Sequence, residues 1–429
     1  MTNINDIETV DFNQDLTIRH AIMASNHQPS DDGHDKEDEL RRVKGTIVDK
    51  SGEVVHPGSF FPYEFVDKEQ CKKKMDELNH KFEDMNVEYS YEGTIIRIFY
   101  YKQWYISTHR KLDSSKSKWG SNESFRFLFE NGLKESYNIT LQDLINKLNL
   151  RCRYTFMIMA NENTRFVCVA SHYPKKVYFV GSNDPGVKLN IDLLPKPEER
   201  FETLDRAFEY VEGMTYPFTH QGLLLVHPNG SQYRVISAEY ERLFQVRKNE
   251  QSIPYRYLQL KSQDDHNSIA LLKKLFPEHV QTFDSYDNYV QKLAAIIYDE
   301  YNLRKQRSKL PENLTTVQQI DQKLYLFIKN NLLGHRPDSI TYKKISELLW
   351  LEQPSNLNHM IRMVKYNERK KEREEASPTP TPIESGQTEG SKILDERTLT
   401  TTKSLKKKRV KYTRSSIPIE YTCRKRLVA

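Results

Sequence analysis

The sequence has few cysteines and no long apolar segment. Its four cysteines among 429 residues lie far apart and form no CxxC pair, which argues against a zinc ribbon or a disulfide framework and favours a reducing, cytoplasmic setting. Cys152 and Cys168 fall in apolar stretches and are expected to be small buried side chains. No run of about 18 apolar residues occurs, so neither a membrane span nor a membrane partner is expected. The N-terminus also lacks the pattern of a secretory signal.

Motifs for phosphate loops and metal sites are missing as well. The sequence contains no GxxxxGK[ST] segment, and its 13 histidines form no HExxH or comparable pattern. No metal site is therefore predicted. The glycine-rich segment 181–186 is interpreted as a turn and not as a phosphate-binding loop.

The positive charge of the chain is concentrated at its end. The formal net charge is +6, but ten Lys and Arg residues lie between Lys403 and Arg426 against one acid, Glu420. This basic tail contains the run Lys406, Lys407, Lys408 and Arg409. Such a run is typical of nucleic-acid contacts or of a nuclear import signal, and the alternative is a solubilising tail.

Composition and periodicity divide the chain into five parts and predict an α+β fold. Residues 1–37 are too polar to bury a core, and the segment EEASPTPTPIESGQTEGS has the composition of a linker. The predicted parts are a disordered acidic N-terminus (1–37), a domain of antiparallel sheets and helices (38–260), a helical domain (261–372), a disordered linker (373–402) and the basic tail (403–429).

Hydrophobic patterns locate individual elements in the mixed domain. Strands are expected on both sides of the turn 50–52, in a hairpin near 94–100 and 103–108, and in the segments 153–160, 165–171 and 176–181. A Pro-Asn-Gly turn at 228–230 is expected to join two further strands. Helices are predicted over 201–211 and over a segment that places Met75, Leu78, Phe82 and Met85 on one face.

Three segments, in this order, resemble motifs of a known family. They are KGTIVDKSGEVVHPGSFFPYEF from Lys44, YEGTIIRIFYYKQWYISTHRKLDSSKSKWGS from Tyr91, and HQGLLLVHPNGSQYRVISAEY from His220. Together they resemble the nucleotidyltransferase domain of phage-type ATP-dependent RNA ligases and their relatives in large DNA viruses. The resemblance covers residues 41–245 and implies a ligase-type fold, which uses ATP and Mg²⁺ to form a lysine–AMP intermediate before RNA ends are sealed.

The resemblance assigns the positions of a nucleotide cleft, but most reactive groups are replaced. The family's nucleophile motif, Lys-x-Asp-Gly, corresponds to Ser90, Tyr91, Glu92 and Gly93. A later arginine, two glutamates and two lysines of the family correspond, in that order, to Arg97, Met157, Gln221, Arg234 and Ile236. A serine hydroxyl cannot form the phosphoramidate that a lysine amine forms. The preserved glycines and apolar positions therefore indicate a retained fold without the chemistry.

The segment after the predicted hairpin contains a basic run. Lys111-x-Asp113 is a loose match to the nucleophile motif, which makes Lys111 a weak candidate for the nucleophile. Arg110, Lys111, Lys116 and Lys118 lie near Trp104, Tyr105 and Trp119, and basic side chains interleaved with aromatics suit single-stranded RNA. The alternative is a solvated strand end beside core aromatics.

The sequence thus favours an RNA-binding protein with the RNA-ligase fold, without lysine adenylylation and without a cofactor. Two alternatives stay open. One is an active, diverged RNA ligase that uses ATP and Mg²⁺ through another lysine. The other is a structural protein that binds a protein partner through its helical domain. A cytoplasmic location is expected, with nuclear entry through residues 406–409 as the alternative.

Overall fold

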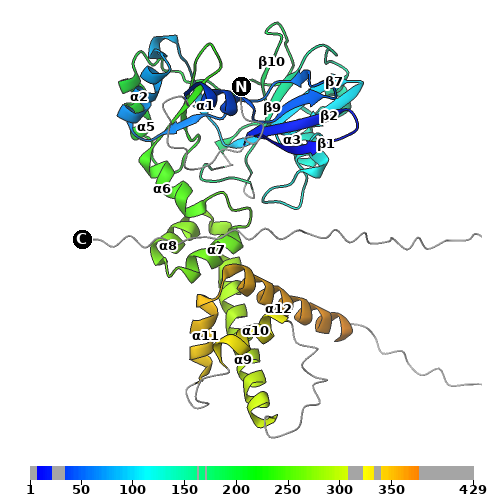
Figure 1. The fold of residues 1–429 in the computed structure, drawn as a ribbon, viewed down its shortest axis with the longest axis vertical. Helices are drawn as coiled ribbons and strands as arrows, with labels where there is room; N and C mark the ends of the chain where they lie inside the picture. Colours follow the sequence, from blue (N-terminus) through cyan, green and yellow to red (C-terminus); the bar gives the residue numbers. More distant parts are fainter. Residues whose placement is uncertain are drawn as a thin grey trace, which may run out of the picture. The chain divides into compact units, whose positions relative to one another are not determined.

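A computed structural model describes residues 7–21, 34–161, 164–169, 172–307, 322–332 and 340–375. Within these residues the chain combines three four-stranded sheets with a helical C-terminal region (Figure 1). This arrangement confirms the predicted mixture of antiparallel sheets and helices. The basic tail, and the predicted linker beyond residue 375, lie outside the described residues.

The first sheet corrects the prediction that residues 1–37 are disordered. Residues 7–21 form two antiparallel strands, and α1 (His34–Arg42) crosses the predicted boundary. The reason is a short alternation in which Leu16 and Ile18 are buried against Ile47 of the next strand. The predicted turn at 50–52 joins the last two strands and is confirmed. The strands are β1 (Ile7–Phe12), β2 (Leu16–Ala21), β3 (Thr46–Asp49) and β4 (Val54–His56), in that order.

The second sheet contains the predicted hairpin and has the order β10-β9-β7-β8. Its strands are β7 (Gly93–Tyr101), β8 (Gln103–Ser107), β9 (Tyr154–Met159) and β10 (Val177–Ser182). One face packs its side chains Ile96, Ile98 and Phe156 against Phe129 and Leu133 of a helix that the sequence did not predict. This helix is α3 (Phe125–Tyr137), and α4 (Leu141–Ile145) adds Leu144 to the same core. The strand predicted over 165–171 is wrong, because described residues 164–169 form a loop.

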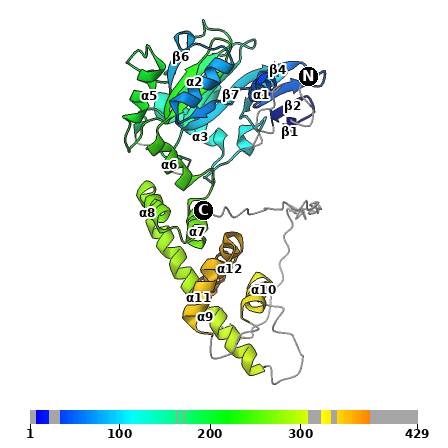
Figure 2. The same ribbon diagram turned by 60° about the vertical axis from the view of Figure 1, so that its left-hand side comes forward.

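The third sheet has the order β5-β12-β11-β6. Its strands are β5 (Tyr63–Phe65), β6 (Asn86–Ser90), β11 (Gly222–Val226) and β12 (Gln232–Ile236), and β5 alone pairs in parallel. One face carries Leu223, Leu225, Tyr233 and Val235 against α2 (Lys68–Glu77) and α5 (Leu204–Glu212) (Figure 2). The predicted turn between β11 and β12 is confirmed.

Both predicted helices of this region are shorter than expected. The helix α2 ends before Leu78, because Asn79 adopts a left-handed backbone with φ of 53°. Phe82 then lies in a separate short 3-10 helix, η2 (Phe82–Asp84). The helix α5 begins after Thr203, whose hydroxyl accepts a hydrogen bond from the Arg206 N–H, and not at the predicted residue 201.

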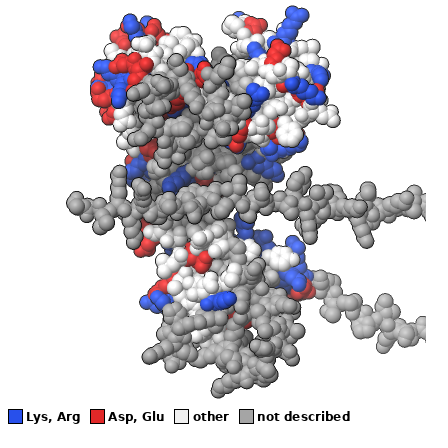
Figure 3. Space-filling model, viewed as in Figure 1, with Lys and Arg blue, Asp and Glu red and all other residues white. Residues whose placement is uncertain are grey.

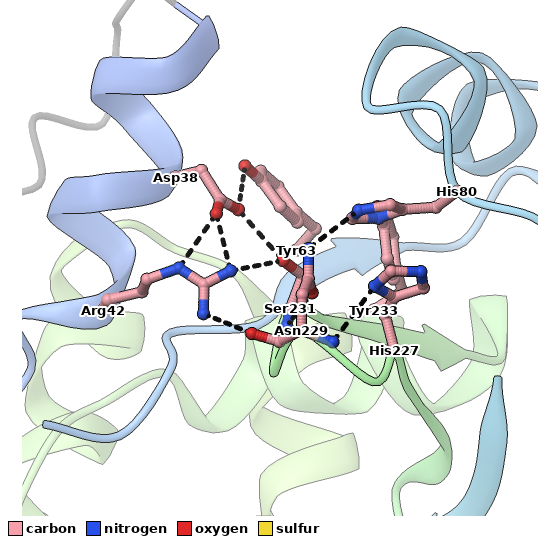
Figure 4. A network of polar contacts seen from close by, with 8 residues as sticks. All are labelled: Asp38, Arg42, Tyr63, His80, His227, Asn229, Ser231 and Tyr233. Atoms are coloured by element: carbon pink, nitrogen blue, oxygen red, sulfur yellow. Dashed lines mark hydrogen bonds and ion pairs between the residues drawn. The ribbon is translucent and has the colours of Figure 1, made fainter. Parts of the chain in front are cut away.

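A polar network attaches α1 to the turn between β11 and β12. The Asp38 carboxylate accepts hydrogen bonds from Arg42 Nη2 at 2.8 Å and from Ser231 Oγ at 3.3 Å. Arg42 Nη1 also donates to the Asn229 carbonyl at 2.7 Å. The network (Figure 4) joins the residues Asp38, Arg42, Tyr63, His80, His227, Asn229, Ser231 and Tyr233. Since three segments distant in sequence meet here, the network fixes the first helix on the third sheet.

The helical region is less separate than predicted. The boundary expected between residues 260 and 261 falls inside α7, where Leu260 packs into a core shared with Met159 and Cys168. Leu258 packs instead into the core of the helices that follow, in which α11 lies along α9 (Figures 1 and 2). The helices are α6 (Ala238–Arg247), α7 (Ile253–Ser262), α8 (His266–Leu275), η5 (Pro277–His279), α9 (Val280–Arg307), α10 (Gln322–Asn331), α11 (Tyr342–Leu351) and α12 (Pro354–Glu375). None of the helices within the described ranges has the length and apolar character needed to cross a membrane.

Candidate functional site

The nucleophile position of the resemblance lies where the chain passes from one sheet to another. Ser90 is the last residue of β6 in the third sheet, and Gly93 is the first residue of β7 in the second. Ser90 pairs with Gly222 of β11, and its carbonyl accepts a hydrogen bond from the Gln221 N–H at 2.7 Å. The structure therefore brings Ser90 and Gln221 together.

Four side chains form a buried polar chain at this point. Ser90 Oγ donates to Gln221 Oε1 at 3.1 Å, and Gln221 Nε2 donates to the Tyr240 hydroxyl at 2.9 Å. The Tyr240 hydroxyl donates to Glu92 Oε1 at 2.9 Å. Glu92 is 2% exposed. Burial, followed by the charge of Glu92, raises the pKa of Tyr240 well above its usual value, so this phenol stays a donor.

Glu92 also accepts hydrogen bonds from three successive backbone amides. The N–H of Phe166 donates to Oε2 at 2.7 Å, and the N–H groups of Val167 and Cys168 donate to Oε1 at 2.8 and 3.0 Å. A buried carboxylate with this many donors is stable without a bound cation. These bonds explain why the segment predicted as a strand is a loop, since its amides point to a side chain and not to a neighbouring strand.

The two motif glycines allow close contact between strands. A Cβ at Gly93 would lie 2.7 Å from the Ile158 carbonyl oxygen. A Cβ at Gly222 would lie 2.0 Å from the Val235 carbonyl oxygen, and the φ of Gly222 is +147°. Both positions therefore require glycine, and both requirements come from strand packing.

The other positions of the resemblance lie on two facing sheet surfaces. Ser90, Arg234 and Ile236 share the face of the third sheet opposite to the core residues that pack on α2 and α5. Met157 lies on the face of the second sheet opposite to α3, and its strand neighbour Met159 shares a core with Ile236. Met157 and Ile236 thus pack into one shared core between these surfaces.

The guanidinium groups of Arg97 and Arg234 both bind other groups of the protein. Arg97 is 1% exposed and donates to the carbonyls of Gly45 and Thr108, the latter at 2.6 Å. Burial lowers the pKa of Arg97 to about 9. Arg234 forms an ion pair with Glu64 of β5. Both guanidinium groups therefore connect elements of the fold.

The predicted basic run is exposed but partly ion-paired. The Lys111 amine lies 3.2 Å from Asp11 of β1, and Arg110 lies 3.3 Å from Glu8. Lys116 and Lys118 are exposed. The pairing with Asp11 opposes a nucleophilic role for Lys111, because a nucleophile needs a free lone pair.

The neighbouring aromatics belong mostly to the interior. Tyr105 is 7% exposed and stacks on Phe99, with ring centroids 5.3 Å apart. Trp119 packs against Phe166 and lies under the guanidinium of Arg247. On the face drawn in Figure 3, Lys and Arg of the described residues are interspersed with Asp and Glu. The described residues contain no group of three or more His, Cys, Asp or Glu side chains that could hold a metal ion.

Sequence reasoning missed two parts of the site. Tyr240 ends the third resembling segment, at the position of the family's final tyrosine, but received no role. The amides of 166–168 could not be found from side-chain patterns, because backbone groups bind here. A carboxylate that is buried needs hydrogen-bond donors. An acidic residue between two apolar strands, as at Glu92, was therefore the one sign in the sequence that such donors lie nearby.

The sheets and helices around this polar chain make the chain a mixed α+β protein. No family model matches its sequence. Two relatives are similar over most of their length. The immediate-early protein ICP-46 homolog of Invertebrate iridescent virus 3 is 52% identical over 377 residues, which cover 84% of each chain. The homolog of the same name in Invertebrate iridescent virus 6 is 29% identical over 355 residues, 75% of this chain and 76% of the relative. The chain belongs to the family of iridovirus immediate-early protein ICP-46 homologs.

Proposed function

We propose that this chain is an RNA-binding protein built on an RNA-ligase-type nucleotidyltransferase domain that forms no lysine–AMP intermediate. The observation that carries the proposal is the buried chain Ser90–Gln221–Tyr240–Glu92. Four residues from three motifs, distant in sequence, meet between two sheets at the positions that the resemblance assigns to a nucleotide cleft. Their spatial agreement supports the ligase-type fold.

The residues at these positions do not fit ATP with Mg²⁺. Ser90 offers a hydroxyl where an amine must attack phosphorus, and this hydroxyl already donates to Gln221. The two positions that would supply carboxylates for the metal are Met157 and Gln221. Glu92 keeps a carboxylate, but four protein donors use its oxygens. The remaining role for such a domain is binding without transfer chemistry.

The RNA-binding part of the proposal rests on exposed cations. Lys116, Lys118 and Arg110 lie on one segment after β8, where phosphates can reach them. The basic tail adds ten cationic residues between Lys403 and Arg426. The relatives are named immediate-early proteins, and an RNA-binding regulatory role is compatible with that name.

Incubation with α-³²P-labelled ATP and Mg²⁺ tests the absence of adenylylation. We expect no covalent label on the full chain after denaturing electrophoresis, because the cleft positions contain no amine. An active RNA ligase, labelled in parallel, shows that the assay detects lysine–AMP. An acid-labile label on this chain would overturn the proposal, and its loss in Lys111→Met would locate the nucleophile.

Fluorescence anisotropy with a labelled single-stranded RNA tests binding. We expect the full chain to bind, with an affinity that falls steeply between 50 and 200 mM salt, as phosphate contacts require. A full-length variant with Lys406, Lys407, Lys408 and Arg409 all changed to Gln should bind more weakly but still measurably, because the folded region contributes cations. If the unaltered chain does not bind RNA at low salt, the proposed function is wrong. The alternative of a structural protein that binds a protein partner would then be favoured.

A further inference from the structure

A cavity of about 400 Å³ lies beside the N-terminal sheet, and its lining includes none of Ser90, Gln221, Tyr240 and Glu92. Its lining residues are far apart in the sequence. They come from β1, β2, α1 and the segments that follow α1, β4 and β8. These include Glu8, His20, Leu40, Lys44, Phe61 and Arg110. Its volume falls in the range of about 300 to 1,000 Å³ that is usual for small-ligand sites.

Lys44 supplies a cation to this wall, which also contains the carboxylate of Glu8. Its amine makes no hydrogen bond or ion pair with any of the residues that the structure describes, and it lies 4.8 Å from the ring centroid of Phe61. Burial, followed by the positive charge of Arg234, lowers the pKa of Lys44 to about 8, and the negative charge of Glu64 partly offsets this shift. An anionic ligand would stabilise the charged form of this half-buried amine. It would compensate for the hydration lost on burial and for the repulsion by Arg234.

His20 adds a neutral donor to the same wall. The Gly45 N–H donates to His20 Nδ1 at 3.1 Å, so the ring proton of the neutral histidine lies on Nε2. Burial, and then the charges of Arg110 and Lys44, lower the pKa of His20 to about 4. The ring therefore stays neutral at physiological pH.

Arg110 and Phe61 complete the set of groups that a nucleotide needs. Arg110 is exposed and pairs with Glu8 at 3.3 Å, a surface contact of small energy that a phosphate can replace. Phe61 is 39% exposed, which is unusual for a phenylalanine beside a cavity. Its exposed ring offers a stacking surface for a base, while two cations, one neutral N–H and the Glu8 carboxylate that pairs with Arg110 surround the cavity.

We infer that this pocket binds a nucleoside monophosphate unit, with its phosphate on Lys44 and Arg110 and its base on Phe61. The unit is either a free nucleotide or one residue of single-stranded RNA. The RNA form of this inference rests on the proposed function, and the free-nucleotide form does not. The alternative occupant, an acidic peptide, would use the cations but not the exposed ring.

Binding of AMP to the full chain, measured by isothermal titration calorimetry at 50 mM salt, tests the pocket. We expect Lys44→Met to weaken AMP binding at least tenfold, and Arg110→Gln and Phe61→Ala to weaken it about threefold or more. Lys50→Met is the matched control, because Lys50 is exposed on the turn between β3 and β4 of the same sheet. It should change the affinity by less than twofold. Arg110→Gln alters an exposed side chain, so it keeps the test valid if Lys44→Met unfolds.

The RNA arm separates this inference from the proposed function. Using the full chain with Lys406–Arg409 changed to Gln, we expect Lys44→Met to weaken single-stranded RNA binding and to reduce its salt slope by about one. If neither Lys44→Met nor Arg110→Gln changes RNA binding, the inference that the pocket binds a nucleotide is wrong. The proposed RNA-binding function would still hold. AMP binding that depends on Lys44, without any RNA binding, would support the pocket and overturn the proposed function. Displacement of AMP by poly-glutamate but not by inorganic phosphate or RNA would assign the pocket to acidic peptides and overturn the inference.

Discussion

Replacing Glu92 with alanine is expected to destabilise the protein by about 5 kcal/mol, since each buried donor left without a partner costs about 1 to 3 kcal/mol. The substitution would remove the acceptor of three backbone amides and of the Tyr240 hydroxyl. All four donors lie in the core that joins the sheets to α6, α7 and α8. Because domains are stable by only about 5 to 15 kcal/mol, much of this variant should be unfolded at room temperature.

Urea unfolding followed by circular dichroism measures this effect. Glu88→Ala is the matched control, because Glu88 lies four residues before Glu92, on β6, with a side chain that is 38% exposed, and it should cost less than about 1 kcal/mol. Glu92→Gln should lower the free energy of unfolding by an intermediate amount. Its amide NH₂ would replace one carboxylate oxygen, so a backbone N–H that now donates to that oxygen would face another donor. Equal midpoints for Glu92→Ala and Glu88→Ala would show that this carboxylate does not hold the loop 166–168.

The elements that could be predicted from the sequence are those whose hydrogen bonds are local. The hairpin β7–β8 and the pair β11–β12 each join neighbouring segments through a short turn, so alternation and turn residues suffice. The meeting of Ser90 with Gln221 was available through the resemblance alone, because β6 and β11 are more than 130 residues apart. Periodicity carries no information on such a pairing.

The elements that could not be predicted depend on distant partners. The segment 166–168 has the composition of a strand, yet its amides bind the Glu92 carboxylate. The N-terminal strands look too polar to order, but Leu16 and Ile18 need only the sheet beside them to become buried. In both cases tertiary contacts decide the conformation, and propensity does not.

The candidate site shows the same difference between what local sequence patterns predict and what distant contacts decide. Motif order predicted which residues line a nucleotide cleft, and that cleft stays a prediction. The contacts of these residues depend on partners that the sequence does not display. Arg97 connects two carbonyls and Arg234 connects to Glu64, so two expected ligand-binding cations instead stabilise the fold. The sequence analysis assigned no function to Lys44, because the lack of a hydrogen bond or ion pair at its amine, among the described residues, depends on the folded structure.

Stability is expected to fall steeply as the pH is lowered from 6.5 to 5. Burial lowers the pKa of His56 to about 3 and the pKa values of His20 and His220 to about 4. In the unfolded chain each has a pKa near 6.5. Between these values the unfolded state binds more protons than the folded state, so the free energy of unfolding decreases as the pH falls. Three such histidines give a slope of about 3 kcal/mol per pH unit, at about 1.4 kcal/mol per proton.

Urea unfolding at pH 7.5, 6.5, 5.5 and 5.0 measures this slope, and His56 supplies the most specific variant. His56 is 6% exposed, its Nδ1 bonds to the Pro57 carbonyl at 2.8 Å, and its Nε2 has no partner among the described residues. A proton on Nε2 would therefore be buried without an acceptor, beside the ring of Phe99. His56→Phe should reduce the slope by about 1 kcal/mol per pH unit, while His266→Phe, at a side chain that is 77% exposed, should leave it unchanged. A slope that is the same in both variants as in the unaltered chain would mean that His56 binds its proton equally well in the folded and unfolded states.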